Sequence, residues 1–152
     1  MKKVSELDKR LLSYVNVLLL SNRLETIMDK NLKEISTKQW IALIMLGTFE
    51  NPPTLKELAK KCGITHQSTM QLVKRLQNKG YVTIVKDEKD KRALRIITTD
   101  KRDKWTDQYA EENMHYIETL FFDLTERELE IFCKAQFKLY ERLEIMAKEL
   151  KV

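Results

Sequence analysis

Residues 54–98 contain two short helical patterns around a glycine turn, and two segments rich in Val, Ile, Thr and Tyr follow them. Thr54 and Glu57 have the spacing of a capping box, which starts a helix, and Gly63 stands where a left-handed residue can end it. Thr65 can cap a second helix. The apolar positions of the two helices recur at helical spacing and are Leu55, Leu58, Ala59 and Cys62, then Thr69, Leu72, Val73 and Leu76. A connection this short predicts a helix-turn-helix.

The face of the second helix opposite its apolar positions is polar and cationic. No Asp or Glu occurs between Thr65 and Lys79. The side chains on this face or beside it are Gln67, Ser68, Gln71, Lys74, Arg75 and Asn78. Such a face suits a DNA groove, where phosphates and base edges are available as partners. The alternative is a helix face that only contacts solvent.

The two β-rich segments, Tyr81–Lys86 and Ala93–Thr98, predict a hairpin whose polar loop spans residues 87–92. An arginine at the end of such a loop, here Arg92, can enter the narrow, electronegative minor groove beside the helix. Asp90 would repel DNA, so we expect it to fix the turn and hold a basic neighbour by hydrogen bonding. The alternative is an ordinary exposed turn of mixed charge.

Basic charge is concentrated on the same segment. Residues 54–104 contain 14 Lys and Arg against 6 Asp and Glu, whereas the rest of the chain contains 14 against 17. Because phosphate neutralisation supplies most of the non-specific affinity for nucleic acid, this asymmetry favours double-stranded DNA as a partner. A membrane surface is disfavoured, since the basic residues do not share one amphipathic helix.

These motifs resemble the MarR (multiple antibiotic resistance regulator) family of winged-helix repressors. The resemblance covers nearly the whole chain and rests on Ile35–Trp40, Glu57–Ala59, Val73–Leu76, Lys79–Val82 and Asp90–Arg92. It implies a homodimer that binds pseudo-palindromic operators and is released by small molecules or oxidants, with Arg92 as the minor-groove residue of the wing. Two positions depart from the family pattern. Met70 stands where the recognition helix is usually polar, and Arg102 stands where a glycine commonly follows the wing.

The flanks of the chain predict long helices. One apolar pattern runs from Ser5 to about Asn31, and a second begins at a capping box formed by Thr125 and Glu128. Helices of about 25 residues reach nearly 40 Å, so we expect them to pack on a second subunit rather than within one chain. The predicted fold is mainly α (α+β): a winged helix-turn-helix with a two-stranded wing, flanked by long N- and C-terminal dimerisation helices.

Three parts are expected: an N-terminal dimerisation helix (1–35), the DNA-binding lobe (36–98), and a linker helix with the C-terminal dimerisation helix (99–152). The linker helix is predicted over 99–120, with Trp105 on its apolar side. With three glycines, the chain cannot form a glycine-rich phosphate loop, and it has no catalytic motif, so we expect neither an enzyme nor a cofactor.

The two cysteines have structural interpretations. Cys62 and His66 are four residues apart, but the Gly63 turn separates them, so no metal site is expected. Cys62 is interpreted as apolar packing, and Cys133 as a core or dimer-helix residue. Two cysteines, with no export signal and no membrane span, point to a reducing cytoplasm.

We therefore predict a cytoplasmic, dimeric transcriptional regulator, most simply a repressor. Gln67, Ser68 and Gln71 would read the major groove, and Thr65, Lys74 and Arg75 would hold phosphates or guanines. Arg92 would enter the minor groove, and Asp90 would support it by fixing the wing turn. Tyr14, Trp40, Trp105 and Tyr109 could line a small-molecule effector pocket, or they could be ordinary core aromatics. The alternative functions are a winged-helix protein-interaction module that binds no DNA and a thiol-based redox-sensing regulator.

Overall fold

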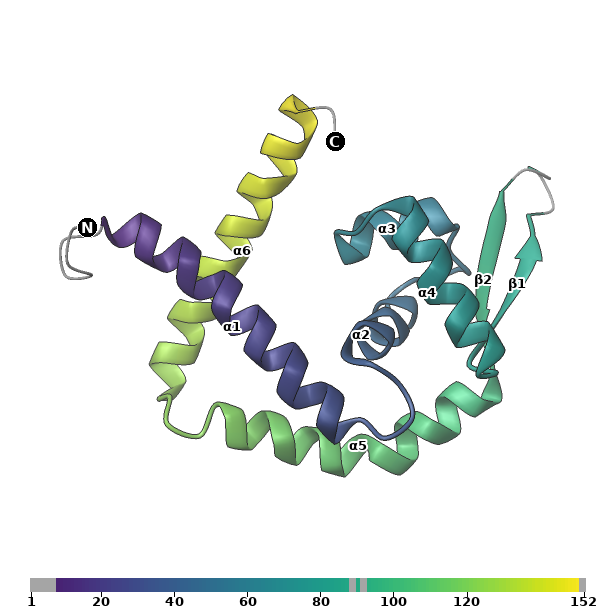
Figure 1. The fold of residues 1–152 in the computed structure, drawn as a ribbon, viewed down its shortest axis with the longest axis horizontal. Helices are drawn as coiled ribbons and strands as arrows, with labels where there is room; N and C mark the ends of the chain where they lie inside the picture. The colour runs from purple at the N-terminus through teal and green to yellow at the C-terminus, as the bar shows by residue number, and fades with distance from the viewer. Residues whose placement is uncertain (1–7, 88–89, 91–92, 151–152) are drawn as a thin grey trace. The chain divides into compact units, whose positions relative to one another are not determined.

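The computed structural model describes residues 8–87, 90 and 93–150, and it contains six helices and a two-stranded sheet within them. The elements in chain order are α1 (Lys9–Asn31), α2 (Thr37–Leu46), α3 (Leu55–Cys62), α4 (His66–Asn78), β1 (Val82–Lys86), β2 (Leu94–Thr98), α5 (Asp100–Leu120) and α6 (Glu126–Glu149) (Figure 1). This order confirms the predicted mainly α winged helix-turn-helix. Residues 5–7 of the predicted first helix, and Arg92, lie outside the described residues.

Two compact units make up the chain, Met1–Trp105 and Thr106–Val152. The first contains the winged helix-turn-helix, and its core is built from every element of that motif. The largest fully buried side chains in this core are Tyr81, Leu58, Leu76, Ile96, Val73, Val82 and Thr69. The compact first unit also includes α1 and the start of α5. The division predicted at residues 35 and 98 was by role rather than by compactness, so it stays a prediction.

Local capping explains where the helices of the first unit begin. Thr54 Oγ1 accepts a hydrogen bond from Glu57 N, and the Glu57 carboxylate accepts one from Thr54 N at 2.6 Å, which completes the predicted capping box. The hydrogen bond from Thr54 N and, next in size, the one that the Thr54 hydroxyl donates to the Glu57 carboxylate at 2.8 Å lower the pKa of Glu57. Gly63 ends α3 with φ 65°, in the left-handed region that favours glycine.

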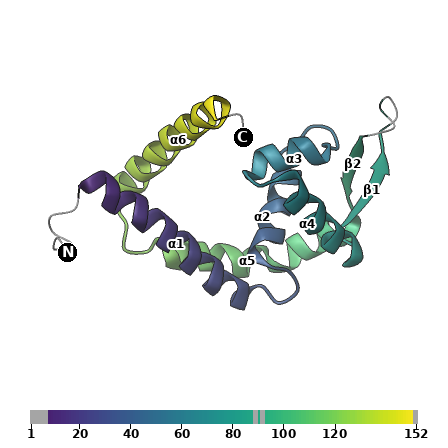
Figure 2. The ribbon, with the colours of Figure 1, turned by 45° about the horizontal axis from the view of Figure 1, so that its top comes forward.

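The wing is a regular antiparallel hairpin. Its register pairs Val82 with Thr98 and Lys86 with Leu94, and it lies next to α4 in both views (Figures 1 and 2). Strand β2 also contacts the segment before α3, since Ile96 N donates to Pro53 O at 2.9 Å. Tyr81, predicted as the first strand residue, precedes β1 and is fully buried. The hydrogen bond from Ile96 to Pro53 therefore holds the wing against the helix-turn-helix.

The long terminal helices leave their apolar side chains exposed. Met28 is the one buried side chain among the described residues of α1, and no described residue of α6 is buried. The exposed large apolar residues include Leu11, Val15, Leu18 and Leu24 on α1, and Ile131, Phe137, Leu139 and Leu143 on α6. None of the helices in the described part of the chain combines the length and apolarity needed to cross a bilayer.

Candidate nucleic-acid interface

The N-terminus of α4 is organised by the hydroxyl of Thr65. Its Oγ1 accepts a hydrogen bond from Ser68 N at 3.1 Å and lies 2.9 Å from Ser68 Oγ, to which it donates. Thr69 is buried one turn on, and its hydroxyl donates to Thr65 O at 3.0 Å. Thr65 and Ser68 are exposed, so the two hydroxyls stand together at the start of the helix, on the surface.

The outer face of α4 carries free polar and cationic side chains, as the sequence pattern predicts. Gln67, Gln71 and Lys74 are exposed, and none of them has a side-chain partner among the described residues. Leu72, Val73 and Leu76 are buried on the opposite side. At 100° per residue, Gln67, Gln71 and Lys74 lie within about 60° of one another around the helix axis. They therefore form one surface that donors and acceptors of a DNA groove could contact.

Met70 differs from these residues. Its side chain is half-buried at the edge of the exposed face, between Gln67 and the buried Val73. Met70 therefore contributes apolar surface beside the exposed face rather than a hydrogen-bonding group.

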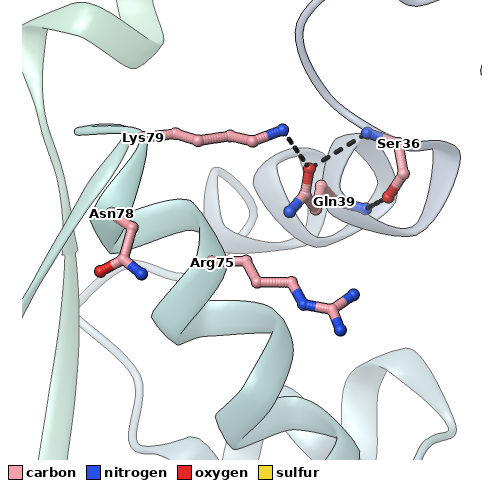
Figure 3. Close-up of a pocket in the computed structure, with 5 residues that line it drawn as sticks. All are labelled: Ser36, Gln39, Arg75, Asn78 and Lys79. Atoms are coloured by element: carbon pink, nitrogen blue, oxygen red, sulfur yellow. Dashed lines mark hydrogen bonds between the residues drawn. The ribbon is translucent and has the colours of Figure 1, made fainter.

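A polar cavity lies at the C-terminal end of α4, where this helix meets the start of α2. Its volume is about 440 Å³, and it is lined by Ser36, Gln39, Arg75, Asn78 and Lys79 (Figure 3). Arg75 extends from α4 on the side where the cavity lies. The predicted site residues did not include Ser36 or Gln39, although the Ser-x-x-Gln spacing of residues 36–39 is itself the signal of a capping box, which the structure contains.

The base of the wing is held by a buried carboxylate that the sequence predictions missed. Asp87 is 6% exposed and forms a salt bridge with Arg95 Nε, and Arg95 Nη1 donates to Pro52 O at 2.6 Å. The other Asp87 oxygen accepts from Asp90 N at 2.8 Å. Asp87 therefore joins the loop to β2 and, through Arg95, to the segment before α3. Its signal in the sequence was weak, because a loop aspartate normally contacts solvent.

Asp90 is exposed, and its backbone closes the loop: its N–H donates to Asp87, and its carbonyl accepts from Ala93 N at 2.9 Å. Both bonds involve the Asp90 backbone, so the roles predicted for its side chain, to fix the turn and to hold a basic neighbour, stay predictions. The minor-groove role predicted for Arg92 falls outside the described residues and stays a prediction.

The four aromatic residues predicted for an effector pocket have different environments. Tyr14 is 64% exposed on α1, and Trp40 is half-buried on α2. Trp105 is 5% exposed and packs edge-on against Tyr81, with ring centroids 6.2 Å apart. Tyr109 is half-buried and belongs to the second unit. A second cavity, of about 160 Å³, lies between residues 46–53 and β2, and none of the four lines it or the α4 cavity.

The cysteines do not form a disulfide. Burial raises the pKa of the half-buried Cys62 thiol, which disfavours the thiolate needed for oxidation. Cys133 is exposed on α6. Within the described residues, no group of three or more His, Cys, Asp or Glu side chains could hold a metal ion.

Sequence comparison finds similar proteins for part of the chain. Residues 34–93 match the model of a family described as the MarR family. A relative from Bacillus subtilis (strain 168), described as the uncharacterized HTH-type transcriptional regulator YsmB, is 28% identical over 90 residues, which are 59% of this chain and 62% of the relative. The matched part of the chain therefore spans less than two thirds of that relative.

The fold is shared with solved structures. A MarR protein from Peptoclostridium difficile superposes with a TM-score of 0.83, at 24% identity, over 99% of this chain and 97% of its own. A MarR family regulator from Streptomyces coelicolor, solved in complex with DNA, gives 0.80 at 22% identity over 94% of each chain. An organohalide-sensing regulator, solved with 2,4-dichlorophenol bound, gives 0.81 at 22% identity over 93% of this chain and 85% of its own. Residues 34–93 are thus similar to the MarR family, and the chain has the winged helix-turn-helix fold of these solved structures.

Proposed function

We propose that this protein binds pseudo-palindromic operator DNA as a homodimer, represses transcription there, and is released by a small-molecule effector. The observation that carries the DNA-binding part is the outer face of α4. There Gln67, Gln71 and Lys74 are exposed without partners among the described residues, on a helix that contains no carboxylate. In this proposal Gln67, Ser68 and Gln71 read base edges, and Thr65 and Lys74 contact the backbone.

The apolar stripes of the terminal helices support a homodimer. Soluble monomers seldom expose so many large apolar side chains on one helix. Nine of the 23 residues of α1 are large apolar residues that are at least 37% exposed, and α6 has a similar series. A second copy of the same chain would cover these faces and would place two recognition helices on two half-sites of a palindrome.

An effector fits the proposal because the relative solved with 2,4-dichlorophenol is a sensing regulator of the same fold. Tyr14, Trp40 and Trp105 of the first unit are our candidates for its contacts, and Tyr109, which belongs to the second unit, is a separate candidate. An oxidant is the less favoured signal, because the pKa of Cys62 is raised rather than lowered.

Selection of bound sequences from a random duplex library tests the central claim. We expect a recovered palindrome, with affinity for it that falls steeply as salt rises. A protein-interaction module would recover no sequence and show no salt slope, which would reject the DNA-binding proposal. Adding the recovered operator to a transcription assay then tests repression directly, since an activator would raise the transcript level.

A further inference from the structure

The cavity between the start of α2 and the end of α4 is lined by hydrogen-bond donors. Its five residues are Ser36, Gln39, Arg75, Asn78 and Lys79, and none of them is acidic. Two of the five are cations. An open hollow that contains two cations and no carboxylate favours an oxyanion as its ligand.

Gln39 is the most informative of these residues, because its side chain is buried and yet not fully used. The residue is 5% exposed. Its Oε1 accepts hydrogen bonds from Ser36 N at 3.1 Å and from Lys79 Nζ at 3.3 Å. Two donors at one carboxamide atom identify that atom as the oxygen, so the other is the NH2 group.

The Nε2 group of Gln39 has no hydrogen-bond partner among the described residues. Figure 3 shows it on the side of the cavity where Arg75 and Asn78 lie. This amino group still reaches solvent, so water can bind it in the free protein, and a ligand with an acceptor atom could replace that water.

The two cations have different settings. Lys79 Nζ is held in place, because it donates to Glu34 O at 2.6 Å as well as to Gln39. Arg75 is exposed, and its guanidinium has no partner among the described residues. One cation is thus fixed in position and the other is free to form a bidentate pair with two oxygens of an anion.

We propose that this cavity is an oxyanion site that holds one backbone phosphate of the bound DNA, with Arg75 and Gln39 Nε2 as its main donors. The proposal rests on the proposed function and deepens it. Arg75 lies one turn beyond Gln71 and is rotated about 80° from Gln67 around the helix axis. A group bound there lies at the edge of the surface that enters the major groove, where a phosphate of the strand passes.

The site therefore assigns Arg75 to a phosphate and not to a guanine. It also gives Gln39 and Lys79, which belong to no base-reading surface, a part in positioning the recognition helix. A phosphate clamped between α2 and α4 would fix how deep α4 lies in the groove without reading any base.

The test uses the full-length protein and its selected operator, in which each phosphate in turn is replaced by an uncharged methylphosphonate. For the wild type, one phosphate per half-site should weaken binding roughly 10-fold when it is neutralised. In Arg75→Ala the same replacement should have little further effect, because the partner of that phosphate is already lost. The ranking of base variants of the operator should not change in Arg75→Ala.

Gln39→Glu is the second variant. Glutamate at this position can still complete the capping box with Ser36, so the fold is retained, but an oxygen replaces the Nε2 donor. We expect it to weaken binding and to lose the dependence on the same phosphate. Gln77→Glu is the matched control: it adds the same charge to an exposed position of α4 that does not line the cavity, so it should keep that dependence.

Two results would overturn the proposal. The first is additivity: each methylphosphonate lowers the binding free energy by the same amount in Arg75→Ala as in the wild type. The second is binding of inorganic phosphate by the free wild type, lost in Gln39→Glu, without coupling to any phosphate of the operator; the site would then take a free oxyanion. A wild type that binds no duplex at all would instead reject the proposed function, and the titration with inorganic phosphate would still test the cavity.

Discussion

Tyr81 Oη donates a hydrogen bond to Glu34 Oε2 across 2.6 Å, and this bond joins the turn after α4 to the segment that connects α1 with α2. The same carboxylate lies 3.9 Å from Lys101 Nζ, which stands 4.6 Å from the centre of the Tyr81 ring. Three segments that are distant in sequence meet at this point. The ring itself is fully buried against Trp105.

Removing the hydroxyl should separate the contribution of this bond from that of the ring. We expect Tyr81→Phe to lower the free energy of unfolding by about 1 kcal/mol, because Glu34 is exposed and can be solvated again. Tyr81→Ala should lower it by about 3–5 kcal/mol through loss of buried area and a cavity. Denaturant unfolding measures both. An equal decrease in the free energy of unfolding in both variants would show that the ring contributes nothing beyond its hydroxyl.

Asp29 makes stability depend on pH. Its Oδ1 accepts from Thr37 N and from Thr37 Oγ1, both at 2.6 Å, and these bonds, the side-chain one first, lower the pKa of Asp29. A carboxyl with a lowered folded-state pKa stabilises the protein above its unfolded pKa, about 3.9, and loses that stabilisation as pH falls through the folded value.

Asp29→Asn should therefore be less stable than the wild type at neutral pH, and the difference should shrink as pH falls below about 4. Thermal midpoints between pH 2 and pH 7 measure it. Asp107, which has neither a hydrogen bond nor an ion pair among the described residues, provides the control substitution Asp107→Asn. A difference from the wild type that is constant across the range would show that the charge of Asp29 does not contribute.

Gln71 and Lys74 should differ in what they contribute to DNA binding. A glutamine can pair with adenine through two hydrogen bonds, so Gln71→Ala should change the ranking of operator variants by about 1–3 kcal/mol at one position. Lys74→Ala should lower affinity for all sequences alike and reduce the salt slope by about one. An unchanged ranking in Gln71→Ala would contradict the placement of this face of α4 in the major groove.

Two residues of the wing should differ in role: Arg92 should contact the DNA, whereas Asp87 should hold the wing in place. Arg92→Ala should weaken operator binding strongly while changing the free energy of unfolding by less than about 0.5 kcal/mol, as for a surface site. Asp87→Ala should weaken binding and also destabilise the protein by about 1–3 kcal/mol, because it leaves Arg95 without its carboxylate. Operator affinity and unfolding in one buffer distinguish the two. Destabilisation by Arg92→Ala would show that this residue supports the wing.

The sequence predicted the parts of the fold that local chemistry determines. Thr54 with Glu57, and Thr125 with Glu128, start their helices through bonds between residues three apart, which a sequence displays directly. The strand pairing followed from two segments rich in Val, Ile and Thr on either side of a polar loop. The predicted strand started one position too early, at Tyr81, because tyrosine is a residue type that is common in strands.

The contacts that build the candidate site are mostly not local. Arg95 reaches Pro52 and Lys79 reaches Glu34, which are 43 and 45 residues away in sequence. No periodicity identifies such partners, because they depend on how α2 packs against α3 and α4. The burial of Asp87 and the cavity beside Arg75 were therefore visible only in three dimensions.

The dimer should depend on the exposed stripe of α6. Phe137 and Leu143 are 72% and 60% exposed, so a charge at either position costs little in the isolated chain but would be buried unpaired in a dimer interface. We expect Phe137→Asp and Leu143→Asp to sediment as folded monomers and to bind the operator more weakly, because one half-site alone contributes less affinity. Lys138→Asp changes a neighbouring exposed position of the same helix and should remain dimeric. Helical content measured on the same samples shows that the chains are folded. A wild type that sediments as a stable monomer at micromolar concentration, or Phe137→Asp and Leu143→Asp that both remain dimers, would show that α6 does not hold two subunits together.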